Sequence, residues 1–204
     1  MNRARLVFLL ATPVLAVALA ACGGSPSGPA ASATESASAP ATGSSQSSAA
    51  ATAFNQQDTS FASNMIQHHR QAVEMADLVA SRSTDQKVID LATRIKAAQS
   101  PEITTMNGWL KSWGMPEVED MSGMDMAGSM PGMMSATDLA ELAALTGPAF
   151  DQKFLTMMIT HHEGAITMAQ EQIAKGQNTD AKALAQRVTT DQTAEIAQIR
   201  AMLD

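Results

Sequence analysis

The feature that most constrains the fold of this chain is an internal repeat. Shifting the sequence by 93 residues aligns residues 58–110 with residues 151–203 without a gap. The aligned positions include all four histidines and the methionine that precedes each histidine pair: Met65 with Met158, His68 with His161 and His69 with His162. A chain built in this way is expected to fold as two copies of one structural unit.

Each copy predicts a pair of amphipathic helices. Apolar residues in 56–81 recur at heptad spacing, with the histidines filling gaps in the apolar stripes, and the second copy repeats the pattern. The second helices are expected at 85–112 and 179–203, and a short extra helix at 137–145, ended by Gly147-Pro148. No segment alternates as a strand does, so the sequence predicts an all-α four-helix bundle made of two helical hairpins.

The histidines are the strongest candidates for a metal site. Successive helical residues are about 100° apart, so each pair flanks the centre of a broad apolar face. If the first helices of the two copies face each other, His68, His69, His161 and His162 converge near the middle of the bundle. Neutral imidazole is the commonest protein metal ligand, and bundles build metal sites between facing helices. A buried histidine is otherwise a hydrogen-bonded core residue, and this alternative stays open.

Methionines and glutamates at repeat-equivalent positions extend the predicted site. Thioethers stand one turn before and two turns after the histidines in both copies: Met65 and Met75, Met158 and Met168. Glu102 and Glu195 are expected to accept hydrogen bonds from the imidazole nitrogens that do not face the metal. The alternatives are that the methionines only fill the core and that the glutamates are solvated.

The linker between the copies, residues 113–136, contains seven of the 15 methionines. Glycine and proline oppose a helix here, so we expect these sulfur atoms to lie outside the core. Thioethers are soft ligands that select Cu(I). The candidate ligands of a low-affinity site are Met121, Met124, Met126, Met130, Met133 and Met134. The alternative is a methionine-rich linker that binds nothing.

The N-terminus predicts export and anchoring. Arg3 and Arg5 precede an apolar run that is too short to span a bilayer comfortably and that ends in Leu-Ala-Ala-Cys, which looks like a bacterial lipobox. We therefore expect a lipoprotein signal peptide over 1–21 and a lipid on Cys22, with an ordinary secretory signal as the alternative. The protein is then expected outside the cytoplasm, anchored to the cell membrane.

The rest of the chain divides by composition. Residues 22–56 are rich in Ala, Ser and Thr and have no apolar periodicity, which predicts a disordered tether. Residues 57–204 are expected to form the four-helix domain. Its first copy covers 57–112 and its second covers 137–204.

Composition also excludes several classes of function. The formal net charge of −7 opposes binding to a nucleic-acid backbone. A single cysteine excludes an intramolecular disulfide and a thiolate zinc cluster. The sequence has no GxxxxGKS/T loop, no GxGxxG turn and no HExxH pair. We expect neither a nucleic-acid partner nor an enzymatic activity.

The repeated motif, MIQHHRQAVEMA at 65–76 and MITHHEGAITMA at 158–169, resembles the DUF305 family. The resemblance covers roughly residues 55–204. It implies a ferritin-like four-helix bundle in a secreted or envelope protein. The family includes periplasmic copper-binding proteins of the CopM type, so the resemblance also implies copper.

Histidine combined with methionine favours copper, and Cu(I) over Cu(II), because hard cations prefer oxygen and zinc more usually recruits cysteine or carboxylate. The expected function is buffering, sequestration or transfer of copper, with no transfer partner identified. Two alternatives stay open. One is a metal-free helical binding module of the cell envelope. The other is a ferritin-like metal oxidase, which requires inward Glu-x-x-His pairs that neither first helix carries.

Overall fold

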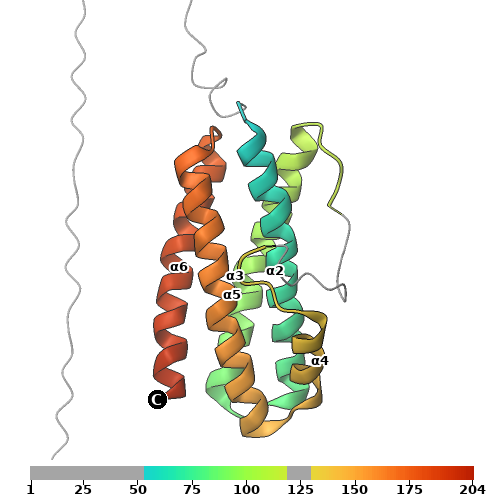
Figure 1. Ribbon diagram of the computed structural model, residues 1–204, viewed down its shortest axis with the longest axis vertical. Helices are drawn as coiled ribbons and strands as arrows, with labels where there is room; N and C mark the ends of the chain where they lie inside the picture. Colours follow the sequence, from blue (N-terminus) through green and yellow to red (C-terminus); the bar gives the residue numbers. More distant parts are fainter. Residues whose placement is uncertain (1–52, 119–129) are drawn as a thin grey trace, which may run out of the picture. The chain divides into compact units, whose positions relative to one another are not determined.

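The computed structural model describes residues 53–118 and 130–204, which form five helices and no strand. The first hairpin consists of α2 (Gln56–Arg82) and α3 (Gln86–Ser112), and the second of α5 (Gly147–Lys175) and α6 (Thr179–Leu203) (Figure 1). The short helix α4 (Ala136–Ala144) packs against α5. The predicted all-α bundle of two hairpins is confirmed.

The two hairpins meet chiefly through their first helices. In each hairpin the two long helices pack along each other, and the main contact between hairpins is that of α2 with α5. The condition under which the histidines were expected to converge is therefore met. Among the described helices, none combines the length and the apolar character that crossing a bilayer demands.

Side-chain caps set the starts of four helices. Asn55 and Ser135 form capping boxes with Asp58 and Asp138, while Asp85 and Asn178 accept hydrogen bonds from the first turns of α3 and α6. The bundle begins a few residues before position 57, because the Ala53 carbonyl accepts a hydrogen bond from the Asn178 side chain.

One boundary prediction was wrong. Gly147-Pro148 was expected to end the short helix, but α4 stops at Ala144 and these two residues begin α5 instead. Proline suits this position because the first helical N–H groups have no partner within the helix, so the missing donor is not needed.

A buried carboxylate joins the start of α2 to the turn between α5 and α6. Asp58 is fully buried and accepts hydrogen bonds from the backbone N–H groups of Asn55, Gln177 and Asn178 at 2.8–3.1 Å. The Gln172 side chain adds a further hydrogen bond of 2.6 Å. Its repeat equivalent, Asp151, is only partly buried, and its Oδ1 has no hydrogen-bond partner among the described residues.

Replacing Asp58 with alanine should therefore destabilise the bundle strongly. We expect the free energy of unfolding to fall by about 3 kcal/mol or more, because several buried donors lose a charged acceptor. The matched control is Asp151→Ala, which should lower it by less than about 1 kcal/mol. Denaturant unfolding monitored by circular dichroism measures both values, and equal losses would contradict this account of the corner.

Candidate metal centre

A layer of polar side chains cuts across the core at mid-height. Apolar residues on either side of it form two separate buried clusters, and every long helix contributes to both clusters. Between the clusters, each helix of the bundle carries two polar residues. We call this set the polar layer: His68 and His69 of α2, Gln99 and Glu102 of α3, His161 and His162 of α5, Gln192 and Glu195 of α6.

Two of the four histidines meet at the centre of this layer. The rings of His68 and His161, both completely buried, have their centroids 3.8 Å apart at an interplanar angle of 39°. They come from the two helices through which the hairpins pack together. The contact that joins the hairpins at this height is therefore a pair of imidazoles.

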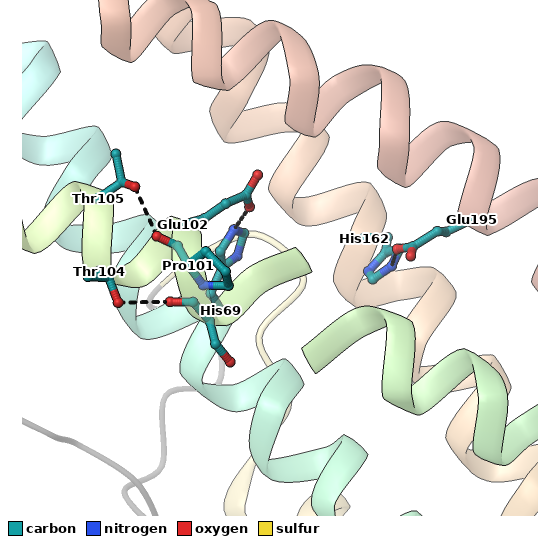
Figure 2. A network of polar contacts seen from close by, with 8 residues as sticks. His69, Pro101, Glu102, Thr104, Thr105, His162 and Glu195 are labelled. Carbon is teal, nitrogen blue, oxygen red and sulfur yellow. Dashed lines mark hydrogen bonds and ion pairs between the residues drawn. The ribbon is translucent and has the colours of Figure 1, made fainter. Parts of the chain in front are cut away.

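The other two histidines reach toward glutamates within their own hairpins. Figure 2 shows His69 of α2 against Glu102 of α3, and His162 of α5 against Glu195 of α6, as two separate pairs. In each pair Nε2 lies 2.7 Å from the carboxylate, and each glutamate side chain is 20% exposed. A carboxylate accepts hydrogen bonds, so Nε2 is the donor, and in the neutral ring Nδ1 then carries the lone pair.

These contacts have the geometry expected from the sequence for Glu102 and Glu195. Their role as groups that orient metal ligands stays a prediction. The repeat reproduces the two pairs with the same distance and the same exposure, although Glu102 directly follows Pro101 in α3 and Glu195 follows Ala194. The proline carbonyl remains bonded, to the Thr105 hydroxyl (Figure 2).

The polar layer contains most of the buried polar atoms that lack a partner. Of ten such side-chain atoms in the described residues, eight belong to this layer. They are Nδ1 of His68, His69 and His162, both ring nitrogens of His161, both side-chain polar atoms of Gln99, and Oε1 of Gln192. Buried polar groups are normally satisfied, and a bound ion is one of the things that satisfies them.

The central histidines are neutral at ordinary pH. Burial lowers the pKa of His68 to about 3, helped by the nearby ring of His69 and opposed by the Pro131 carbonyl. Burial likewise holds the pKa of His161 well below its usual range, and the neighbouring histidines lower it further. Neutral imidazole is the form that binds metals, so both rings are ready to act as ligands.

The predicted methionine ligands flank the layer on both sides. Met75 and Met158 lie in one core cluster, while Met65 and Met168 lie in the other. All four are buried, so both the core-filling alternative and the ligand role fit their positions. The antiparallel packing of α2 and α5 explains the exchange, since the methionine before one histidine pair shares a cluster with the methionine after the other.

The four histidines do not gather into one cluster. Within residues 53–118 and 130–204, no three His, Cys, Asp or Glu side chains are grouped as a metal site. The structure brings together His68 and His161, and it pairs His69 and His162 with glutamates. A site of three or more ligands at this layer would therefore have to include thioethers.

The linker methionines divide into two groups. Met121, Met124 and Met126 lie outside the described residues, as do Cys22 and the signal peptide. The expectation that the linker sulfurs stay out of the core is wrong for Met134, which is 7% exposed and belongs to a core cluster. Met130 is partly buried against the other cluster, and Met133 is half-buried.

Sequence reasoning missed the contacts between the linker and the layer. The Pro131 carbonyl lies 3.1 Å from His68 Nε2, and the Gln71 side chain exchanges two hydrogen bonds with the Met134 backbone. The available signal was the change within the repeated motif, where HHRQ in the first copy becomes HHEG in the second.

Comparison with known proteins places these features in a family. The sequence profile of a domain of unknown function, DUF305, matches residues 58–203. A candidate secreted DUF305 protein from Streptomyces coelicolor is 33% identical, with a TM-score of 0.66 over 72% of this chain and 91% of that one. A DUF305 fragment from Deinococcus radiodurans is 30% identical, with a TM-score of 0.66 over 73% and 96%.

Structures of the protein CopM are also similar. Its Cu(II)-bound form is 29% identical, with a TM-score of 0.63 over 72% of this chain and 95% of that one. Its Cu(I)-bound form is 28% identical, with a TM-score of 0.59 over 71% and 94%. No curated protein matches the chain.

The buried histidines predict acid sensitivity of the metal-free protein. The unfolded chain takes up protons near the ordinary histidine pKa of 6.5, whereas the folded His68 does so only near 3. Between these values the unfolded state binds more protons, so stability falls as the pH falls from 7 toward 4. At pH 4.5 the loss should be roughly 2 kcal/mol for each buried ring.

The control for this prediction is the double variant His68→Gln/His161→Gln, which cannot titrate at these positions. Denaturant unfolding at pH 7 and pH 4.5 should show a smaller loss for the variant than for the unmodified protein. If the two proteins lose the same stability, the buried neutral rings are not the source of the acid sensitivity.

Proposed function

The chain belongs to the DUF305 family, and from this premise we propose that it is an extracytoplasmic, membrane-anchored protein that binds copper in order to buffer, sequester or pass it on. The observation that carries the proposal is the polar layer, in which five imidazole nitrogens are buried without a partner between two sets of buried thioethers. Ring nitrogens and thioethers together are a donor set for a soft metal ion.

The residues of the layer fit a metal ion better than they fit a purely structural role. An unsatisfied buried polar atom costs about 1–3 kcal/mol, and several such atoms in one layer weaken an apolar core. A metal ion would satisfy the ring nitrogens by accepting their lone pairs. Glu102 and Glu195 would hold His69 and His162 as the Nε2–H tautomer, which leaves Nδ1 available as the ligand atom.

The choice of copper rests on ligand chemistry and on the similar structures. Thioethers favour Cu(I), for which silver(I) is a chemical mimic, whereas zinc, calcium and magnesium favour other donors. CopM, at about the same overall fold, is described in Cu(I)-bound, Cu(II)-bound and silver-bound forms. We favour Cu(I) for this chain because the buried sulfurs Met65, Met75, Met158 and Met168 outnumber the carboxylates next to the site.

We propose a binding protein and not an oxidase. A dinuclear carboxylate centre needs several carboxylates that face each other across the bundle. Here the two glutamates of the layer each pair with a histidine of their own hairpin, and the described residues hold no group of three carboxylate or histidine ligands. Copper would therefore be the cargo of this protein.

Replacing the methionine that precedes each histidine pair should weaken copper binding without disturbing the fold. Leucine conserves the volume of methionine but removes the sulfur. We expect Met65→Leu/Met158→Leu to lower the Cu(I) affinity on the order of tenfold or more, measured by competition with a chromogenic Cu(I) chelator. The matched control is Met106→Leu, at a fully buried position of α3 whose repeat equivalent is Ile199.

The histidines give the stricter test. A variant with His68, His69, His161 and His162 all changed to alanine should lose stoichiometric Cu(I) binding, provided that its circular dichroism shows a folded bundle. If this variant binds Cu(I) with unchanged stoichiometry and affinity, the copper site lies elsewhere.

The anchoring part of the proposal rests on the lipobox-like sequence before Cys22. A thioether-linked lipid on this cysteine would hold the protein at the membrane surface. We expect Cys22→Ser to move the protein from the membrane fraction to the soluble extracytoplasmic fraction, whereas Ser25→Ala, a nearby control, should leave it membrane-bound. Retention of the Cys22→Ser protein in the membrane fraction would contradict lipid anchoring.

A further inference from the structure

The last part of the linker is docked directly onto the polar layer. We call residues Met130–Met134 the linker strap. Its Pro131 carbonyl accepts a hydrogen bond from His68 Nε2 at 3.1 Å. Three residues further along α2, the Gln71 side chain bonds both the N–H and the carbonyl of Met134, at 2.8 and 3.0 Å. The strap is therefore held by the same helical turn that carries the first histidine pair.

The opposite wall of the strap is built from glycine. A Cβ atom added to Gly164 of α5 would overlap the Pro131 carbonyl group and the Gly132 Cα. A Cβ atom on Gly132 would lie 2.7 Å from the Thr160 carbonyl oxygen, and its φ of +76° already favours glycine. The strap can approach α5 this closely only because both chains lack a side chain here.

The strap explains where the two repeats differ. Gly164 is the repeat equivalent of Gln71, so one copy supplies the hydrogen bonds that hold the strap and the other supplies the space. The preceding positions differ in the same way. Arg70 bonds the Val118 carbonyl at the start of the linker, while its equivalent, Glu163, pairs with Arg200 at 2.9 Å.

The strap also crosses the boundary between the two core clusters. Met130 packs against the cluster that contains Met65, and Met134 belongs to the cluster that contains Met75. Pro131 and Gly132 lie between them, at the height of His68. The strap is thus fixed on both sides of the polar layer as well as at its centre.

A main-chain carbonyl has no proton to donate, so the hydrogen bond with Pro131 requires His68 to carry its proton on Nε2. The neutral ring then has its lone pair on Nδ1, which is buried and has no partner among the described residues. Glu102 and Glu195 impose the same tautomer on His69 and His162. Pro131 therefore does for His68 what the two glutamates do for the outer histidines.

We propose that the linker strap is the third orienting group of the metal centre, so that docking of the strap on Gly164 and Gln71 sets the tautomer of His68 and raises the affinity of the bundle for Cu(I). The proposal rests on the proposed function for its metal, while the link between strap and ring is a property of the metal-free protein. Pro131 and Gly164 act as positioning residues and contact no ion themselves.

The test is Gly164→Ala in the purified protein. The added methyl group displaces the strap, whereas alanine in place of glycine favours the helix by about 1 kcal/mol, so α5 should stay folded. The matched control is Gly108→Ala, a helical glycine of α3 with nothing within 4 Å of the added Cβ. Gln71→Ala removes the two hydrogen bonds to Met134 and is a second, independent way to release the strap.

Three measurements report on different steps. Hydrogen exchange should show faster exchange of the Met134 amide in Gly164→Ala and Gln71→Ala. Nitrogen-15 chemical shifts of the His68 ring, recorded without metal, should change from a single Nε2–H form to a tautomer average. The Cu(I) affinity should fall on the order of tenfold, as is typical when an outer partner of a metal ligand is lost. Gly108→Ala should change none of them.

Each other outcome overturns the proposal. A protected Met134 amide in Gly164→Ala would remove its steric basis. A released strap with an unchanged His68 tautomer or unchanged affinity would show that the strap does not orient the ligand, and a higher affinity would show that it blocks the site. If even the unmodified protein fails to bind Cu(I), the proposed function fails, while the exchange and tautomer measurements still decide the link between strap and ring.

Discussion

A buried layer of polar side chains is the constraint on which the rest of this bundle depends. Four histidines and two glutamines interrupt an otherwise aliphatic and methionine-rich core, and many of their polar atoms have no partner within the described protein. Such a layer opposes folding, since each unsatisfied group costs about 1–3 kcal/mol. Long helices with 25–29 residues compensate by burying an apolar cluster on each side of it. The architecture thus tolerates a chemically reactive centre by enclosing it between two stable halves.

Duplication accounts for the regular part of this centre. The same histidine–glutamate pair occurs in each hairpin with the same 2.7 Å distance, because the repeat places a histidine and a glutamate 33 residues apart in both copies. The irregular part comes from the linker, which passes over only one side of the α2–α5 contact. Where it passes, the copies differ: Gln71 faces the linker from one helix and Gly164 admits it from the other.

The arrangement suits the capture of a soft ion for reasons of charge and access. The central rings are neutral because burial disfavours their charged form, so a metal ion does not compete with protons at ordinary pH. The outer rings are linked to partly exposed glutamates, which connect the buried layer with the surface. Buried thioethers on both sides add donors that bind protons poorly and Cu(I) well.

The sequence by itself determined the fold class, the hairpin pairing and the candidate donors. Heptad spacing, the 93-residue repeat and the capping residues are local or periodic signals, and they are readable without knowing which helices touch. Glu102 and Glu195 were also predictable as partners of the histidines, because their repeat-equivalent positions recur at a fixed separation from the histidine pairs.

Only the tertiary structure decided which histidines meet and where the linker goes. The antiparallel contact of α2 with α5 brings His68 against His161 and turns His69 and His162 toward their own hairpins, a choice set by helix rotation that adjacent residues in a sequence do not reveal. The burial of Met134 and the bond from His68 to Pro131 depend on a close approach between the linker and a glycine on α5. Such contacts join residues distant in sequence, and no periodicity records them, because a main-chain carbonyl can come from any residue.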